Sequence, residues 1–293
     1  MKPLISVCIP SYQEPKLLDR SLKILSEQTF VDFEVVISDD SNTDELSVLI
    51  SKYQSKLNLI YFRNQPSLGS PANWNRALDL SSGLYKWVLH HDDWLEGKHC
   101  LQVIAEEIQT HPDTELLLVD YWNVSEKNRT KLLHTIDPKI LKMLIKDPYS
   151  IFPSNFIGPP SSVIFASRIQ TYYDPRLKWV VDIDQYVQLL KKAKVVRHLK
   201  EPLVCVTNDS EKQTTFTCQG KPEVELFEWP LVGNKLWKDR GRLTWNQVLF
   251  FKDLFRVQDV YSIHELEQFF HEKLCPPLKI ALCLARWIKR IKG

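Results

Sequence analysis

Short apolar runs alternate with amphipathic segments along the first 125 residues. The runs at 4–9, 33–37, 57–62, 85–89 and 115–121 have the length and composition of buried strands. Between them apolar side chains recur at helical spacing, as Leu18, Leu22 and Leu25 do after Pro15, a residue suited to the first turn of a helix. Further helices are expected over 71–83 and 96–110. This alternation predicts an α/β fold, in which βαβ units form a Rossmann-like, mostly parallel sheet flanked by helices.

The pattern is less regular after residue 125. Helices are expected at 141–145 and 184–192, and strands at 162–166, 195–196 and 203–206. From residue 222 onward the signals are helical and are separated by Gly233, Gly241 and the pair Pro276-Pro277. We therefore expect one domain over 1–220, with halves of about 1–125 and 126–220, and a C-terminal helical extension over 221–293.

Composition narrows the class of protein. The net charge of +2 over 293 residues gives no general attraction to nucleic acid. The six cysteines form no CxxC pair, and Cys8 and Cys205 lie in apolar runs, which favours a reducing compartment. The chain enters its first strand without a signal peptide, and no apolar stretch reaches about 18 residues. These features predict a cytoplasmic protein without a transmembrane helix.

Polar residues follow three of the expected strands, at 10–14, 38–44 and 90–93. The carboxyl ends of parallel strands meet at one edge of a sheet, where ligands of open α/β folds bind. Asp92 and Asp93 are adjacent carboxylates, which repel unless a cation or hydrogen-bond donors offset the charge. Their oxygens suit Mg²⁺ or Mn²⁺ bound to a substrate diphosphate. The alternative is a turn followed by a helix N-cap, because Asp favours both.

Two phosphate-binding signatures are missing from the chain. No G-x-G-x-x-G follows the first strand, which excludes the phosphate loop of a dinucleotide fold. No G-x-x-x-x-G-K-[ST] occurs either, which argues against a P-loop nucleotidase. A nucleoside diphosphate held by a carboxylate-bound metal requires neither motif.

Five motifs in order resemble a known family. They are Val7–Glu14, Gln28–Phe30, Phe33–Ser41, Asn73–Ala77 and Leu89–Asp93. Each is weak alone, but together the sequence over about 4–215 resembles the family 2 glycosyltransferases with the GT-A fold, of the type that builds bacterial surface glycans. The resemblance implies a domain that binds a nucleotide-diphosphate sugar and a divalent metal.

The resemblance also implies roles for individual residues of the first half. Asp39 would accept a hydrogen bond from the base, Asp92 would approach the ribose or diphosphate, and Asp93 would be the main ligand of Mn²⁺ or Mg²⁺. Other residues of the nucleotide site would be Pro10, Tyr12, Glu14 and Asn73. The structural alternative for Asp39 is a turn with an Asx motif, and that for Tyr12 is a core aromatic with an exposed hydroxyl.

The acidic motif departs from the family pattern at its first position. His90 replaces the first acid of a D-x-D-D pattern. A neutral imidazole can ligate Mn²⁺ or contact a diphosphate, or His90 can simply pack in the fold. His91 should point the other way if the strand continues, so we interpret it as structural. The substitution weakens the case for metal dependence.

The segment 179–186 resembles the family's second acidic motif, which supplies the catalytic base of inverting enzymes. Asp182 aligns with that base, and Val181 occupies the position where the family has Glu. A base removes the proton from the acceptor hydroxyl as the oxygen attacks the anomeric carbon. Asp184 is the alternative base and is placed on the acceptor side. Both aspartates could instead cap the helix that ends near Lys192.

Two loops are compared with the acceptor and metal regions of the family. The stretch 155–162 resembles the floor of the acceptor site, with Asn155, Gly158 and Pro159 on the acceptor side; an ordinary rigid turn is the alternative. The stretch 208–215 keeps Gln213-Thr214-Thr215 but has no His where relatives carry a metal ligand. We therefore expect a weaker or water-completed metal shell.

The segment 276–293 is basic and amphipathic. It carries no acid, and its cations are Lys279, Arg286, Lys289, Arg290 and Lys292. Apolar residues share one helical face: Ile280, Leu284, Trp287, Ile288 and Ile291. Such a helix can lie in an anionic membrane interface, here the inner face of the cytoplasmic membrane, or can pack on its own domain.

Together these patterns predict an inverting, metal-dependent glycosyltransferase that moves a sugar from a nucleotide donor, expected to be a UDP-sugar, to a cell-envelope glycan or lipid-linked acceptor. One rival is a sugar nucleotidyltransferase, which would need a Gly- and Lys/Arg-rich first loop that 10–14 lacks. The other is a non-catalytic nucleotide-sugar or glycan-binding protein with the same fold, which the substitutions at His90 and Val181 keep open.

Overall fold

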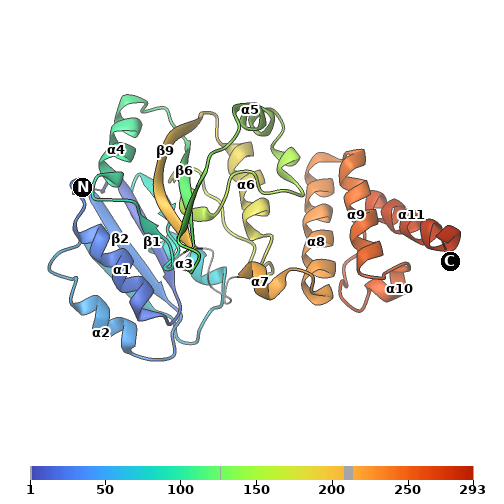
Figure 1. Cartoon of the computed structure of the whole chain (residues 1–293), viewed down its shortest axis with the longest axis horizontal. Coiled ribbons are helices and arrows are strands. Elements are labelled where there is room, and N and C mark those ends of the chain that lie inside the picture. Colours follow the sequence, from blue (N-terminus) through green and yellow to red (C-terminus); the bar gives the residue numbers. More distant parts are fainter. Residues whose placement is uncertain (1, 126, 208–213, 293) are drawn as a thin grey trace. The chain divides into compact units, whose positions relative to one another are not determined.

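The structure is a computed structural model that describes residues 2–125, 127–207 and 214–292. Its internal contacts define two compact units. Unit 1 comprises Met1–Pro148, Phe156–Pro175 and Gln185–Ser210, and unit 2 comprises Tyr149–Asn155, Arg176–Asp184 and Glu211–Gly293. Figure 1 labels the α-helices and several strands of the two units.

The N-terminal part of unit 1 is a parallel βαβ arrangement. Its strands are β1 (Ile5–Ser11), β2 (Phe33–Asp39), β3 (Leu59–Arg63) and β4 (Tyr85–Val88), paired in parallel in the order β3-β2-β1-β4. Its helices are α1 (Pro15–Ser26), α2 (Glu45–Ser51), α3 (Ala72–Leu80) and α4 (Cys100–Thr110). Figure 1 shows α1 lying along β1 and β2. The expected strands and helices of this part are therefore present.

The second part of unit 1 extends the same sheet with mixed strand directions. It contains β5 (Trp94–Leu95), β6 (Leu116–Ser125), β7 (Thr130–His134), β8 (Val163–Ala166) and β9 (Val196–Thr207). β8 is antiparallel to both β4 and β6, whereas β6 and β9 are parallel. The remaining elements are α5 (Pro138–Lys146), the 3₁₀ turn η2 (Pro160–Ser162) and α6 (Val181–Lys192), which crosses from unit 2 into unit 1. Because β8 opposes both of its neighbours, β6 and β9 run in the same direction as the first four strands, and only β5, β7 and β8 oppose it among the described strands; the sheet is therefore mostly parallel, as expected.

Two local expectations need correction. The helix expected from Glu96 begins at Cys100, because Trp94–Leu95 form the short strand β5 against Val204 and Cys205. The two strands expected at 195–196 and 203–206 are one strand, β9, whose pairing with β6 is irregular around Asp120. A bulge of this kind shifts the alternation of side chains, so the sequence pattern of β9 is broken although the strand is continuous.

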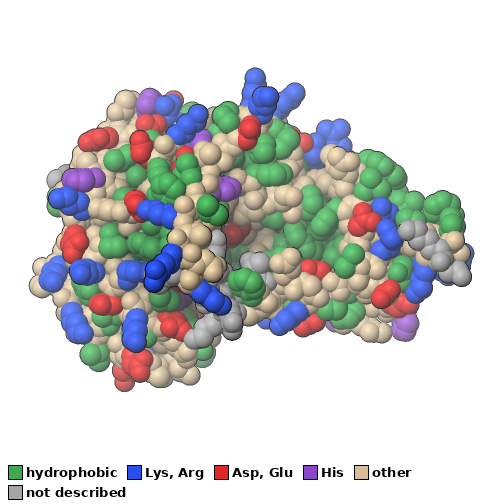
Figure 2. Space-filling view, viewed as in Figure 1, with side chains coloured by type: hydrophobic (Ala, Val, Ile, Leu, Met, Phe, Trp, Pro, Cys, Tyr) green, Lys and Arg blue, Asp and Glu red, His purple; other side chains and the backbone are tan. Residues whose placement is uncertain are grey.

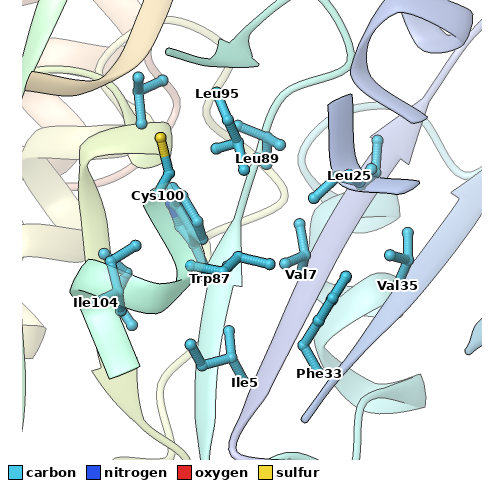
Figure 3. Close-up of a cluster of buried hydrophobic side chains, with 14 of the residues drawn as sticks. Ile5, Val7, Leu25, Phe33, Val35, Trp87, Leu89, Leu95, Cys100 and Ile104 are labelled. Carbon is cyan, nitrogen blue, oxygen red and sulfur yellow. The ribbon is translucent and has the colours of Figure 1, made fainter. Parts of the chain in front are cut away.

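A hydrophobic core fills one face of the sheet in unit 1. Figure 3 shows Val7 and Val35 of neighbouring strands close to Leu25 of α1, with Trp87 and Ile104 beside them. Side chains two apart on a strand share a face, so the odd-numbered residues of β1 and β2 meet the apolar stripes of α1, α2 and α4. On α1 that stripe is Leu18, Leu22 and Leu25, as the helical spacing predicted.

A buried carboxylate joins the amino ends of β1, β2 and β4. Glu34 is 3% exposed and accepts hydrogen bonds from Ser6 Oγ at 2.6 Å and from the Ser82 backbone N–H at 2.6 Å. Gly83 is required here because an added Cβ would lie 2.5 Å from Ser6 Oγ. The polar site expected at the opposite, carboxyl edge is therefore built on strands whose amino ends are joined by this buried carboxylate.

Unit 2 contains α-helices around an aromatic core. Besides the start of α6, its elements include α7 (Thr214–Cys218), α8 (Pro222–Arg240), α9 (Trp245–Val257), α10 (Ile263–Leu266) and α11 (Pro276–Lys292); the 3₁₀ turn η1 (Pro148–Ile151) leads into it. Phe152 packs edge-on against Trp229 at 5.3 Å and is stacked on Phe251 at 5.4 Å between ring centroids. Within the described ranges, no helix combines the length and apolar character needed to cross a bilayer.

Candidate functional site

Three strand ends converge at the carboxyl edge of unit 1, as the sequence predicted. Ser11 at the end of β1 is paired with Asp39 at the end of β2. The Asp40 N–H donates to the Ser11 carbonyl at 2.9 Å, and the Leu89 N–H, just beyond β4, donates to the Cys8 carbonyl at 2.9 Å. The polar segments that follow these strands therefore lie side by side in one region.

Asp39 is fully buried at this edge. Its carboxylate accepts a hydrogen bond from the Ser41 N–H at 2.8 Å and from the Tyr61 hydroxyl of β3 at 2.9 Å. Burial, together with the charge of Asp39, raises the pKa of Tyr61, so the phenol remains a donor at neutral pH. The Ser41 bond is the Asx-type contact expected of a turn, and the Tyr61 contact orients the carboxylate.

Asp40 organises the neighbouring loop. Its carboxylate accepts from the backbone N–H groups of Leu68 at 3.1 Å and Gly69 at 2.7 Å, and from Asn64 Nδ2 at 2.8 Å. Asn64 Nδ2 also donates to Asn73 Oδ1 at 3.0 Å. Asp40 thus holds the segment that leads into α3.

The other residues expected at the nucleotide site surround this edge. Pro10 is buried within β1, and Tyr12 directly after it is 51% exposed. Glu14 precedes α1 with a left-handed backbone, at φ 54°. Asn73 is buried, and its Nδ2 donates to the Ser11 carbonyl at 3.2 Å. Unit 1 therefore brings these four residues and Asp39 to the same end of the sheet.

The segment after β4 places His90, Asp92 and Asp93 together. One possible ligand atom from each residue lies within 4.8 Å of the other two. Asp93 is 3% exposed, and its Oδ2 accepts from the Ser161 hydroxyl at 2.5 Å, whereas Asp92 is more exposed. The His90 backbone N–H donates to the same Ser161 Oγ at 3.1 Å, and the His90 ring packs on Trp74 with centroids 4.6 Å apart. Ser161 therefore fixes the geometry of the whole turn.

Burial controls the ionisation of this cluster. It raises the pKa of Asp93 well above its usual range, and the neighbouring charge of Asp92 raises it further, while the Ser161 hydrogen bond opposes both effects. Burial lowers the pKa of His90 to about 4, so its imidazole is neutral at neutral pH. Two close carboxylates and a neutral imidazole form a site that gains from a cation.

The donor set fits a divalent cation. His90 Nε2 is buried and has no hydrogen-bond partner among the described residues, which is unusual for a ring nitrogen. It lies close to two carboxylates of the kind that bind Mg²⁺ and Mn²⁺, and an imidazole is better suited to Mn²⁺ than to Mg²⁺. Residues His90, Asp92 and Asp93 could therefore hold the metal.

Two side chains of α1, Arg20 and Ser21, support the turn, and no sequence motif predicts this role. Arg20 donates from Nη2 to the Asp92 carbonyl at 2.9 Å and lies over the Trp94 ring at 3.5 Å from its centroid. Ser21 Oγ donates to the Asp93 carbonyl at 2.6 Å. Both residues lie beside the apolar stripe formed by Leu18 and Leu22. The helical spacing of that stripe predicts which face of α1 is buried, but it does not predict that Arg20 and Ser21 contact the turn after β4.

Residues expected on the acceptor side fall in both units. Gly158 and Pro159 belong to unit 1, and Asn155 is exposed in unit 2. Gly158 has φ +116°, and a Cβ there would lie 2.4 Å from the Tyr121 ring, so only glycine fits. Its carbonyl accepts from the Tyr186 hydroxyl at 2.9 Å. The metal-shell expectation for 208–215 falls mostly outside the described residues.

Asp182 and Asp184 lie in the first turn of α6, in unit 2, and have different environments. Burial raises the pKa of Asp182 to about 7. Asp184 is 4% exposed and is paired with Lys235 of α8. Asp184 therefore has a charged partner, whereas burial alone accounts for the raised pKa of Asp182.

Glu228 of α8 binds the segment that leads into α6. It is 2% exposed and accepts from the backbone N–H groups of Lys178 at 2.8 Å, Trp179 at 2.9 Å and Val180 at 3.0 Å. A carboxylate in this position satisfies N–H groups at the helix start and complements the helix dipole. No local pattern in the sequence predicts this contact, because the two segments are about fifty residues apart.

Comparison with known proteins identifies the family. Residues 6–167 match the family model described as Glycosyl transferase family 2, which is more than half of the chain. The chain therefore belongs to this family. The resemblance stated from the five motifs is confirmed.

Two relatives and one solved structure illustrate the similarity. The chain is 28% identical over 194 residues to an uncharacterized glycosyltransferase, MJ1057, of Methanocaldococcus jannaschii, covering 64% of the chain and 65% of that protein. It is 34% identical over 95 residues to the GalNAc(5)-diNAcBac-PP-undecaprenol beta-1,3-glucosyltransferase of Campylobacter jejuni, covering 32% and 31%. The match thus spans less than two thirds of either relative.

The solved structure supports the fold. S. aureus TarS 1–349 in complex with UDP-GlcNAc superposes with a TM-score of 0.65 at 19% identity, covering 97% of this chain and 79% of that one. The α/β sheet flanked by helices and followed by C-terminal helices is therefore a GT-A fold, as expected.

Proposed function

We propose that the chain is an inverting glycosyltransferase that moves a sugar from a UDP-sugar to a glycan or lipid-linked acceptor. The observation that carries the proposal is the cluster of His90, Asp92 and Asp93 at the carboxyl edge of the sheet, with ligand atoms within 4.8 Å of one another. In a member of glycosyl transferase family 2, such a cluster is suited to a metal and a diphosphate.

The donor would bind across the ends of β1, β2 and β4. Asp39 would accept from the base, and Pro10, Tyr12, Glu14 and Asn73 would surround the nucleoside. Tyr12 supports this assignment because half of its side chain is exposed beside the buried Asp39. The similar fold of TarS, whose structure contains UDP-GlcNAc, makes UDP the first nucleotide to test.

The acidic turn would hold Mn²⁺ or Mg²⁺, with Asp93 as the main ligand, Asp92 toward the ribose or diphosphate, and His90 Nε2 as a further donor. When bound, the cation would neutralise negative charge on the departing diphosphate. The chain's own contribution is to fix this turn in advance, through Ser161, Ser21 and Arg20. Preorganised groups lower the barrier because they need no rearrangement during the reaction.

Asp182 would act as the general base. Its carboxylate would take the proton of the acceptor hydroxyl while that oxygen forms a bond to the anomeric carbon; the bond to the diphosphate breaks, and UDP leaves with the electron pair. A base is most effective when its pKa is close to the working pH, and burial brings the pKa of Asp182 to about 7. Asp184, paired with Lys235, suits a role in holding α6 or the acceptor.

The acceptor is proposed from chemistry and from relatives together. The C. jejuni relative is named for action on an undecaprenol-linked glycan. A lipid-linked acceptor would require the enzyme to work at the inner face of the cytoplasmic membrane, in peripheral contact through 276–293. Asn155, Gly158 and Pro159 are proposed to line the acceptor side.

A donor panel tests the proposed function. The purified chain is incubated with Mn²⁺ and a series of UDP- and GDP-sugars, and release of free nucleotide is measured with and without candidate acceptors. One UDP-sugar should release UDP faster than the rest, and Asp182→Asn should abolish the acceptor-dependent part. Binding of a nucleotide sugar without turnover under any condition would favour the non-catalytic alternative.

A further inference from the structure

Helix α11 (Pro276–Lys292) has one apolar face that is already used by the fold. Leu278, Ala281, Leu282 and Ala285 are at most 4% exposed, and the helix packs against α9 and α8. Figure 1 shows α11 beside α9 at the C-terminal end of the chain. Packing within the fold therefore explains one apolar face of this amphipathic helix.

The opposite side of α11 carries a second apolar row. Ile280, Cys283, Trp287 and Ile291 are exposed, with Ile280 at 51%, Trp287 at 61% and Ile291 at 62%. At about 100° per residue these positions fall on one side of the helix, centred opposite the buried face. The sequence pattern groups Ile280, Trp287 and Ile291 with Leu284 and Ile288. In the structure Leu284 and Ile288 are half-buried, so they are not part of this outer row.

A row of cations runs beside the outer apolar row. Lys279, Arg286 and Arg290 are exposed, and each directly precedes an apolar member of the row, so the two rows are parallel. Helix α11 contains no acidic residue. An exposed apolar row bordered by cations complements a surface with an apolar interior and anionic groups at its boundary with water.

The helix is held firmly enough to present this surface. Asn234 of α8 accepts from the Cys275 N–H at 2.9 Å and donates to the Lys273 carbonyl at 3.0 Å, which fixes the start of α11. Near its end, the Lys289 ammonium lies 4.0 Å from the centroid of the Tyr261 ring. The outer row is thus displayed on a packed helix.

We propose that the outer side of α11 docks on an anionic lipid bilayer, with Trp287, Ile291 and Ile280 among the headgroups and Lys279, Arg286 and Arg290 on the lipid phosphates. Tryptophan is favoured at this level of a membrane because its ring is apolar and its N–H is polar. The inference rests on the proposed function in one respect: docking would bring the enzyme to a lipid-linked acceptor. Its test needs neither donor nor acceptor, so the two can fail separately.

Vesicle sedimentation of the full chain tests the docking. Vesicles of phosphatidylglycerol mixed with phosphatidylcholine should bind the protein at low salt, and vesicles of phosphatidylcholine alone should bind it much less. Replacing Lys279, Arg286 and Arg290 together with Glu should lower binding about a hundredfold, because each basic residue at an anionic surface contributes severalfold. Trp287→Ser should lower binding about tenfold.

Two matched controls separate this surface from general effects. Trp245→Ser removes another exposed tryptophan of unit 2, and Lys16, Lys52 and Lys56 replaced together with Glu give the same change in net charge from unit 1. Both controls should bind vesicles like the wild type. Cys283 is exposed and the other five cysteines are buried, so an environment-sensitive dye on Cys283 should shift to the blue with anionic vesicles.

Three results would overturn the proposal. One is an absence of binding to anionic vesicles. Another is equal loss of binding in the controls and in the α11 variants. The third is a dimer in light scattering without lipid that Trp287→Ser converts to a monomer, since the outer row would then be covered by a second copy of the chain.

Discussion

At the scale of single residues, two aspartates two positions apart have been given different chemistry by their surroundings. Asp182 has its pKa raised to about 7 by burial, whereas Asp184 forms an ion pair with Lys235. The sequence left both as candidates for the base. The environments favour Asp182, because a base must exchange a proton near neutral pH.

Asp182→Asn should lower turnover by about 10²–10⁴-fold and leave donor affinity unchanged, since the base acts only in the transition state. In the wild type, turnover should fall about tenfold per pH unit below about 7 and level off above it, because only the deprotonated carboxylate accepts a proton. Steady-state kinetics across pH measure both effects.

Asp184→Asn is the control for that prediction. It should lower stability by releasing Lys235, with a small effect on turnover and no change in the pH midpoint. Loss of turnover in Asp184→Asn with normal turnover in Asp182→Asn would assign the base to Asp184.

Asp39→Ala should weaken UDP binding more than binding of inorganic pyrophosphate, because only UDP contains the base. Leaving a buried partner unpaired typically costs about 1–3 kcal/mol, or about five- to a hundredfold in affinity. Calorimetry with both ligands measures the difference. Tyr61→Phe is the matched control, since it removes the hydroxyl bonded to Asp39 and keeps the carboxylate. Equal losses of affinity for UDP and for pyrophosphate in Asp39→Ala would place Asp39 outside the base pocket.

At the scale of elements, two segments of the candidate site are held by side chains of other elements. The turn after β4 is held by Ser161 and Arg20, and the start of α6 is held by Glu228. Surface loops are otherwise the mobile parts of a fold. These contacts hold in place the two segments that carry the proposed metal and base residues.

Glu228→Gln should reduce turnover about ten- to a hundredfold with little change in the donor KM, because the start of α6 carries Asp182 and small displacements of a reacting group are costly. The glutamine side chain has only one oxygen that can accept a hydrogen bond. Its NH₂ group would face the backbone N–H groups of 178–180, which are also donors. Kinetics of the variant measure the split between kcat and KM.

Glu225→Gln on the same helix is the matched control for Glu228. Glu225 is also buried, but it accepts from the Gly220 N–H and from Gln258. It should lower the melting temperature and leave kcat unchanged. An equal loss of kcat in both variants would mean that Glu228 contributes to stability alone.

At the scale of the whole molecule, positive and negative charges are nearly balanced. Figure 2 shows Lys and Arg side chains interspersed with Asp and Glu over unit 1, consistent with a net charge of +2. The chain therefore has no strong overall field to attract a donor, and if the acidic turn binds a metal, as proposed, donor affinity should depend on that metal.

UDP with Mn²⁺ should raise the melting temperature of the whole chain by several degrees, because a ligand at a hundred times its Kd stabilises the folded state by about 2.7 kcal/mol. A chelator should abolish this increase and leave the melting temperature without UDP unchanged. Differential scanning fluorimetry measures both.

Asp93→Asn and Asp92→Asn should each remove the increase if both carboxylates serve the metal. Asp93→Asn should also lower the melting temperature without UDP, because it weakens the buried contact with Ser161. An increase with UDP that survives both chelation and substitution would contradict the metal assignment.

Local patterns in the sequence determined most helices, most strands and the edge at which polar residues gather. Spacing alone placed Leu18, Leu22 and Leu25 on the buried face of α1, and strand ends alone placed Ser11, Asp39 and His90 at one edge. These features follow from periodicities of two and 3.6 residues, which any segment carries within itself.

Only the tertiary structure decided which distant groups meet. It made β8 antiparallel, put Ser161 on Asp93, brought Glu228 to the start of α6 and left a second apolar row of α11 uncovered. Such contacts depend on which faces of separate elements pack together. Local sequence patterns do not predict that packing, because it involves residues far apart in the chain. The sequence therefore determined what kinds of side chain reach the site, and the packing of the elements determined their partners, their burial and hence their chemistry.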